Sequence, residues 1–174
     1  MNNNQQMLLN EVYMYHESQE FNNILNFINE KTALESCKKY SHHGHTNLYE
    51  HSVAVAYLSY KILKRVNDKN LDEVIIGALL HDYFLYDWHI PDDNRKLHGI
   101  NHPITALENA KKELALSDIS QDVIKKHMFP LTLTPPKYFG SWVVSLSDKI
   151  IATQEIYDNF SFKIKHYMKE RSFI

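Results

Sequence analysis

Six side chains of metal-binding type occupy settings that are unusual for polar residues. Each lies on the apolar face of a predicted helix or close to the end of one. They are four histidines and two aspartates: His51, His81, Asp82, His102, His127 and Asp148. One such histidine is most often a hydrogen-bonded core residue, and one such aspartate is most often a helix cap. Six together favour a shared cation site, because buried carboxylates need partners of opposite charge.

The pair His81 and Asp82 is the centre of this arrangement. It follows the apolar run from Val74 to Leu80, which predicts a buried helix ending on an imidazole and a carboxylate. Two divalent ions could pair with all six side chains, with Asp82 bridging them. This nitrogen-rich donor set suits Fe, Mn, Zn, Co or Ni better than Ca or Mg. Two such ions about 4 Å apart can activate a shared water and stabilise the leaving oxygen of a phosphate ester.

Composition excludes several other classes. The chain has 174 residues, enough for one domain with a substantial core, and a net charge of -2, which gives no general attraction to nucleic acid or acidic membrane. Its one cysteine, Cys37, allows no internal disulfide, and its 4 glycines form no phosphate-cradling loop. No apolar run approaches the roughly 20 residues of a membrane span, and the N-terminus has no signal-peptide pattern. We therefore expect a cytoplasmic protein.

Apolar residues recur at helical spacing along the chain, and no segment has a convincing strand pattern. Helices are expected over residues 18–29, 47–66, 71–80 and 141–157, with others starting at Pro103, where His102 would be the cap, and at a Ser120 cap. Residues 83–101 form a long irregular connection. The expected fold class is all-α, a compact bundle of about six to eight helices. We expect a single domain over residues 1–174, with a core at about 42–157 and helical extensions at both ends.

The segments around the site residues resemble the HD superfamily of metal-dependent phosphohydrolases. They are residues 49–56, 78–82 and 146–149, and the resemblance extends over about residues 42–155. His102 and His127 resemble the subset of that superfamily that holds two metals, and the surrounding segments look like a bacterial branch of predicted phosphohydrolases. The resemblance implies an HD-domain helical bundle, a metal pair, and hydrolysis of a phosphoester or phosphoanhydride by a metal-bound hydroxide. After Asp82 the chain continues with Tyr83, Phe84 and Leu85, where many members have a small residue, Gly and Lys.

Further residues could contact the substrate. Lys149 follows a predicted ligand and could act in catalysis or bind phosphate, although an exposed helix lysine is an equal alternative. One of His42, His43 and His45, which precede the His51 helix, could donate to the substrate or act as a general acid, and His43 is the choice for substrate binding; a solvated loop is the alternative. Arg95 could clamp phosphate oxygens, although a charged surface loop is the simpler interpretation. The aromatic residues within 83–88 could stack on a base or only pack.

The leading hypothesis is a phosphohydrolase that acts on a small phosphorylated metabolite, with a nucleotide favoured. Asp82 would be central to catalysis, and neither nucleic acid nor membrane is expected as a partner. Two alternatives belong to other classes of protein. One is an HD module that senses a nucleotide without hydrolysing it. The other is a di-iron oxygenase of the HD fold, since two irons held by histidines and carboxylates can also activate oxygen.

Overall fold

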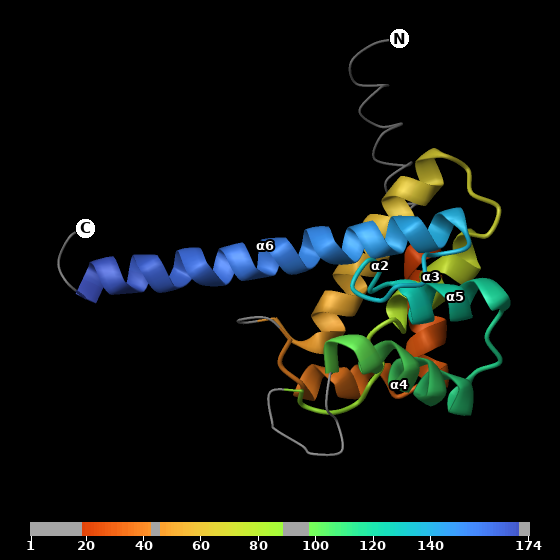
Figure 1. Ribbon diagram of the computed structural model, residues 1–174, viewed down its shortest axis with the longest axis horizontal. Coiled ribbons are helices and arrows are strands. Elements are labelled where there is room, and N and C mark those ends of the chain that lie inside the picture. The colour runs from red at the N-terminus through yellow and green to blue at the C-terminus, as the bar shows by residue number, and fades with distance from the viewer. Residues whose placement is uncertain (1–18, 43–45, 89–97, 171–174) are drawn as a thin grey trace, which may run out of the picture.

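The computed structural model describes residues 19–42, 46–88 and 98–170, and these are helical with short connections (Figure 1). A helix over residues 19–31 is followed by the 3-10 helix η1 and by five α-helices. Their bounds are η1 Leu34–Lys39, α2 Leu48–Arg65, α3 Leu71–Leu79, α4 His98–Glu113, α5 Asp118–Lys126 and α6 Phe139–Glu170. Within the described ranges, the β pairing is confined to an isolated bridge between Ser41 and Asn47. The predicted all-α fold class is confirmed.

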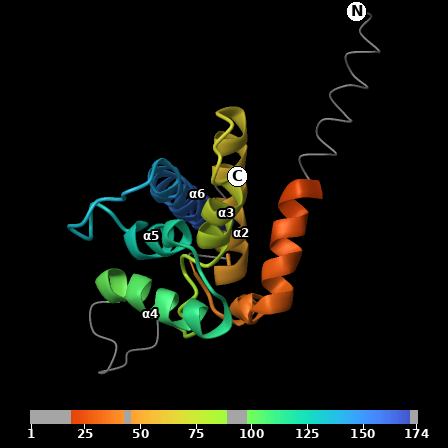
Figure 2. The same ribbon diagram turned by 90° about the vertical axis from the view of Figure 1, so that its right-hand side faces the viewer.

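Helix α3 lies at the centre and packs against α2, α5 and α6 (Figure 2). Its apolar residues are buried around most of its circumference, as expected for a helix enclosed by others. Two glycines allow its close contacts. A Cβ added to Gly77 would lie 2.7 Å from Val123 Cβ on α5, and one added to Gly140 would lie 2.3 Å from Val74 Cγ2. These contacts hold α3 close to α5 and α6.

Replacing Gly77 with alanine is expected to lower the free energy of unfolding by about 1 to 2 kcal/mol. The new methyl group would overpack the contact with Val123, which outweighs the better helix propensity of alanine. Urea denaturation of the metal-free protein measures the difference. The matched control is Gly99→Ala in α4, whose Cβ would lie 3.6 Å from Leu131 Cδ2, an ordinary contact distance. If both variants were equally stable, the contact between Gly77 and Val123 would have room for a methyl group, contrary to the prediction.

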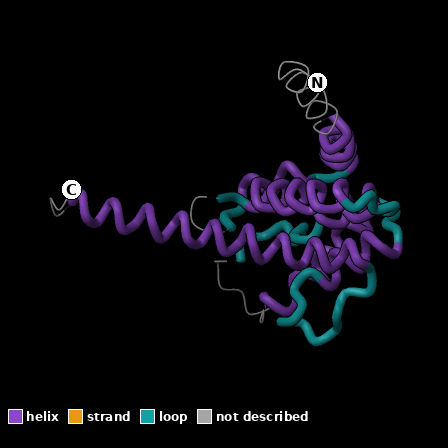
Figure 3. Tube along the Cα trace, turned by 90° about the horizontal axis from the view of Figure 1, so that it is seen from above, coloured by secondary structure: helices purple, strands orange, loops and turns teal. Residues whose placement is uncertain are grey.

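The helix over residues 19–31 shares the core of the other helices. Phe21 is buried, and its ring lies 5.1 Å from that of Tyr57 and 5.6 Å from that of Tyr60, both on α2. Its neighbour Glu20 accepts a hydrogen bond of 2.8 Å from the Tyr60 hydroxyl. At the other end of the chain, α6 extends well beyond the remaining helices (Figure 3). Among the described residues, no helix combines the length and the apolar character needed to cross a membrane.

Two helix starts differ from those that the sequence predicts. Helix α4 begins at His98, so Pro103 lies inside it and His102 is a helical residue rather than a cap. Helix α5 is capped by Ser117, whose side chain accepts from the Ser120 backbone N–H. Ser120 is instead buried and donates a 2.7 Å hydrogen bond to the Glu73 carbonyl on α3. In contrast, α2 begins as predicted, because Asn47 and Glu50 form a reciprocal capping box.

Candidate metal centre

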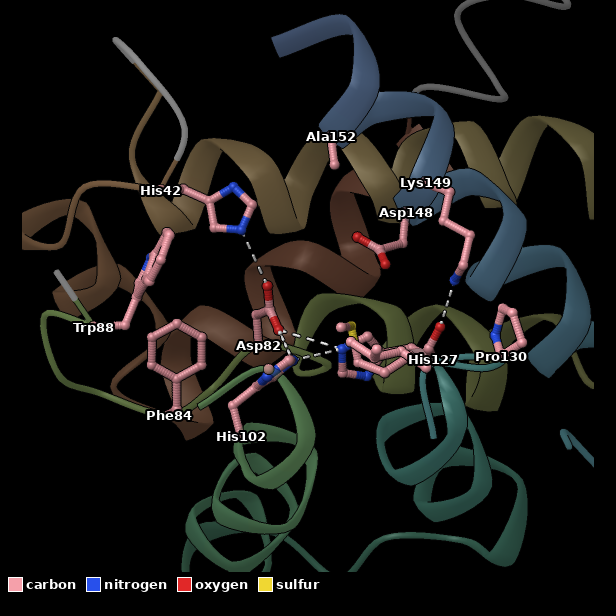
Figure 4. Close-up of a pocket in the computed structure, with 13 residues that line it drawn as sticks. His42, Asp82, Phe84, Trp88, His102, His127, Pro130, Asp148, Lys149 and Ala152 are labelled. Carbon is pink, nitrogen blue, oxygen red and sulfur yellow. Dashed lines mark hydrogen bonds and ion pairs between the residues drawn. The ribbon is translucent and has the colours of Figure 1, made fainter. Parts of the chain in front are cut away.

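The six predicted ligands meet at one buried point, where α2, α3, α4, α5 and α6 converge. Figure 4 shows four of these ligands, Asp82, His102, His127 and Asp148. Asp82 lies at the middle, in the turn that follows α3. Its Oδ1 is 3.1 Å from His102 Nε2 and 3.4 Å from His127 Nε2. Its Oδ2 is 3.5 Å from His81 Nε2 and 3.9 Å from His51 Nε2. The two carboxylate oxygens therefore face different pairs of imidazoles, which is the geometry that a bridging Asp82 requires.

Asp148, on α6, completes one side of this arrangement. Its Oδ1 lies 3.2 Å from His51 Nε2 and 3.8 Å from His81 Nε2. Helix α6 thus brings a carboxylate to the two imidazoles that also face Asp82 Oδ2. The other side consists of His102 on α4 and His127 at the end of α5, whose Nε2 atoms are 2.9 Å apart.

Backbone carbonyls fix the tautomers of two of the histidines. His81 Nδ1 lies 2.7 Å from the Ala78 carbonyl oxygen, and His127 Nδ1 lies 2.8 Å from that of Ile124. A carbonyl oxygen only accepts, so each Nδ1 carries the hydrogen and each Nε2 presents its lone pair to the centre. Burial lowers the pKa of His81 to about 4, which keeps this imidazole neutral, as a metal ligand must be.

Glu155 joins the site although the sequence analysis did not select it. His51 Nδ1 is 3.1 Å from each oxygen of the Glu155 carboxylate, so this nitrogen donates to Glu155 while Nε2 faces the centre. A carboxylate behind a histidine is the usual orienting partner of a metal ligand. Glu155 follows Asp148 by about two helical turns, so both lie on one face of α6. That spacing is the sequence signal that could have identified Glu155.

The carboxylates of Asp148 and Glu155 determine the pKa of the imidazole between them. Burial alone would lower the pKa of His51, but hydrogen bonds to Asp148 and Glu155 prevail and raise it to about 10. For each of these two carboxyl groups, burial favours the neutral form, but hydrogen bonds to imidazoles prevail. The hydrogen bond to His51 lowers the pKa of Asp148 to about 2, and the hydrogen bonds to His42 and His51 lower that of Glu155 to about 2. The metal-free site therefore holds a proton on His51, in a position where a divalent cation would neutralise the same carboxylates.

His42, the described histidine of the histidine-rich loop, reaches the site. Its Nε2 lies 3.5 Å from Asp82 Oδ2 and its Nδ1 lies 3.2 Å from Glu155 Oε2. Burial opposes the charged form, but the hydrogen bonds to Asp82 and Glu155 raise the pKa of His42. The predicted substrate-binding residues His43 and Arg95 lie outside the described residues, and their roles stay predictions.

The donor atoms fit a divalent transition metal. Within the described part of the chain, His81 Nε2 and Asp82 Oδ1 are buried and have no hydrogen-bond partner, which is rare for such atoms. Three groups of side chains have donor atoms that all lie within 4.8 Å of one another, namely His51, His81 and Asp148; His81, Asp82 and His127; and His42, His51 and Asp82. Nitrogen and carboxylate oxygen in a buried site are the ligands that such metals prefer. A cation would satisfy both of these buried atoms, which lack a hydrogen bond.

Lys149 lines the site, but its ammonium group is hydrogen-bonded to other residues of the chain. Its Nζ lies 3.0 Å from the His127 carbonyl oxygen and 3.0 Å from both the carbonyl and the hydroxyl oxygen of Ser145. The Ser145 hydroxyl donates to the same His127 carbonyl at 2.7 Å. Burial lowers the pKa of Lys149, although the charge of Asp148 raises it. As placed, Lys149 secures the backbone at His127, and its contact with phosphate stays a prediction.

Replacing Lys149 with methionine is expected to lower the free energy of unfolding by about 1 to 2 kcal/mol, because the buried His127 carbonyl loses a charged donor. Urea denaturation measures this effect, and Lys125→Met, an exposed substitution on α5, is the control. A variant as stable as the wild type but with a raised KM would instead assign Lys149 to substrate binding.

A cavity of about 750 Å³ opens onto the centre. Asp82, His102, His127 and Asp148 line its polar end, and much of the remaining wall is apolar (Figure 4). The apolar wall includes Phe84, Trp88, Met128, Pro130 and Leu131. Its volume suits a small molecule of nucleotide size.

The aromatic residues after Asp82 divide between the cavity and the core. Phe84 and Trp88 line the cavity, and the Tyr86 ring packs on that of Phe84 at 4.9 Å. Tyr83 is fully buried, and its hydroxyl lies between the Ala33 backbone N–H, at 2.8 Å, and the Glu113 carboxylate, at 3.0 Å. Tyr83 therefore belongs to the core and ties α4 to the segment before η1.

Comparison with protein-family models gives one match, to the HD domain, over residues 48–153. The match contains all six predicted ligands, and it leaves out His42 before its start and Glu155 after its end. Searches of curated proteins and of solved structures found no match.

Proposed function

Because the chain belongs to the HD domain family, we propose that it is a metal-dependent phosphohydrolase with a dinuclear centre, acting on a small phosphorylated metabolite. The observation that carries the proposal is the position of Asp82. Its two oxygens face two separate pairs of imidazoles, at 3.1 and 3.4 Å on one side and at 3.5 and 3.9 Å on the other. One carboxylate between two nitrogen-rich groups suits two ions better than one.

The ligands divide into two groups in this proposal. His51, His81 and Asp148 would hold one ion, His102 and His127 would hold the other, and Asp82 would be shared. Two divalent ions held there would act as Lewis acids on the phosphate and would activate water near neutral pH. Asp148, the second carboxylate ligand, would also offset the positive charge of the ion that it helps to hold.

The rest of the cavity supports a substrate with an apolar or aromatic part attached to the phosphate. The phosphate would lie at the polar end, next to Asp82, and the organic part would lie against Phe84 and Trp88. Flat aromatic walls favour a planar group such as a nucleobase, which is why a nucleotide is the preferred substrate class. His43, Arg95 and Lys149 are proposed as the groups that contact phosphate oxygens.

The test combines metal analysis with a substrate panel. Purified protein is stripped with a chelator, reloaded separately with Fe, Mn, Co, Ni or Zn, and offered nucleoside mono-, di- and triphosphates and p-nitrophenyl phosphate. Release of phosphate or of a nucleotide product that depends on the metal is expected. A metal-loaded protein that cleaves none of these esters would contradict the proposal. Tight binding of an intact nucleotide would then favour a sensor, and oxygen uptake by the iron form would favour an oxygenase.

A further inference from the structure

Two stacked imidazoles share one carboxylate beside the centre. The rings of His42 and His51 lie with centroids 3.8 Å apart and planes inclined by 31°. His42 Nδ1 is 3.2 Å from Glu155 Oε2, and His51 Nδ1 is 3.1 Å from the same oxygen. Both side chains are buried, with His42 8% and His51 0% exposed. The two histidines thus have matching orientations although they come from a loop and from α2.

This arrangement directs both Nε2 atoms toward the same acceptor. A carboxylate only accepts hydrogen bonds, so each Nδ1 that faces Glu155 carries a hydrogen. His42 Nε2 then lies 3.5 Å from Asp82 Oδ2, and His51 Nε2 lies 3.9 Å from that oxygen. The donor atoms of His42, His51 and Asp82 all lie within 4.8 Å of one another. His42 is therefore placed and oriented as His51 is, and Figure 4 shows it directed at Asp82 across the cavity.

We propose that His42 is a seventh donor of the metal centre and binds, through Nε2, the ion shared by His51 and Asp82. Glu155 is the positioning residue that orients both imidazoles. This inference rests on the proposed metal centre. It extends that centre with two residues that lie outside the HD domain match.

The test is a titration of the metal-free protein with Co²⁺, followed by visible absorption. His42→Gln is expected to raise the dissociation constant of one Co²⁺ equivalent about tenfold or more and to change the d–d absorption bands. Glu155→Gln is expected to weaken the same equivalent about 10- to 100-fold, because it releases two imidazoles. Asp158→Asn, an exposed carboxylate further along α6, is the matched control and should bind Co²⁺ as the wild type does.

The outcomes separate this inference from the proposed hydrolysis. Unchanged Co²⁺ affinity and absorption in His42→Gln would overturn it, and a raised KM with an unchanged spectrum would make His42 a substrate contact instead. If His42→Gln fails to fold, wild-type protein labelled with ¹⁵N-histidine gives the answer. There, the Nε2 resonance of His42 should shift with that of His51 on Zn²⁺ addition, and an unmoved resonance would contradict ligation. Failure to find a phosphorylated substrate would leave these metal-binding results intact.

Discussion

Asp82→Asn is expected to lower kcat/KM for a phosphorylated substrate by roughly 10³-fold or more, equivalent to about 4 kcal/mol of transition-state stabilisation. The amide keeps the shape of the side chain but loses the charge that five imidazoles surround at 3.1 to 3.9 Å. It can offer only one good oxygen donor, so two groups of ligands can no longer share it. Metal content, measured on the protein that is used for kinetics, is expected to fall together with activity.

The matched control is Asp72→Asn, at the start of the helix that Asp82 follows. Asp72 is exposed in the first turn of α3 and does not line the cavity, so this variant should keep wild-type activity and metal content. An Asp82→Asn protein that retains both metals and substantial turnover would show that the centre does not depend on a bridging carboxylate.

The sequence predicted the fold class from helical periodicity, and it predicted the meeting of the six ligands because each stood on the apolar face of a helix or close to a helix end. A histidine such as His51, among residues that the core requires, has to point inward with its helix, so its side chain could be placed before any coordinates were known. The same reasoning placed Asp148 on α6. Helical periodicity was therefore enough to bring distant positions together, although it gave no distances.

Glu155 and His42, which the sequence analysis did not assign to the metal centre, do not stand on the apolar face of a predicted helix. Glu155 lies in a stretch of α6 whose flanking residues are exposed, where a carboxylate usually faces solvent. Its helical spacing from Asp148 is the sequence signal, and its pairing with His51 shows its role. In the loop before α2, nothing in the sequence pattern marks His42 as a donor of the centre, since the direction of a loop side chain cannot be derived from hydrophobic periodicity. Helix starts were missed for a related reason. Ser117 and Ser120 are both acceptable caps, and the contact of Ser120 with the Glu73 carbonyl on α3 decides between them.

Metal is expected to stabilise the protein more strongly as the pH rises from about 6.5 to 8.5. In the metal-free protein, the pKa of His51 is raised to about 10, above the ordinary 6.5. The stability that its protonated form contributes is complete below pH 6.5 and is lost progressively as the pH rises toward 10. The raised pKa of His42 acts in the same direction. Metal binding requires neutral imidazoles, so the metal-loaded protein does not depend on these protons.

The buried groups His81 and Cys37 contribute little to the change in stability between pH 6.5 and 8.5. The pKa of His81 is lowered to about 4, so its contribution to stability changes only below pH 6.5, and Cys37, whose pKa burial raises to about 12, matters only above about pH 9. Thermal melts with chelator and with added metal should therefore diverge. The gap between their midpoints is expected to widen by roughly 4 °C or more, the shift that 1 to 2 kcal/mol produces in a domain of this size.

Glu155→Gln provides the control for this pH dependence. It removes one of the carboxylates that hold the His51 proton, so the fall in the melting midpoint of the metal-free protein between pH 6.5 and 8.5 should become smaller. Asp158→Asn should leave the wild-type slope unchanged, since this side chain is exposed and lies beyond Glu155 on α6. A metal-free midpoint that stays level or rises over this interval would mean that His51 is already neutral. The cation would then bind to a site whose imidazoles have no proton to lose.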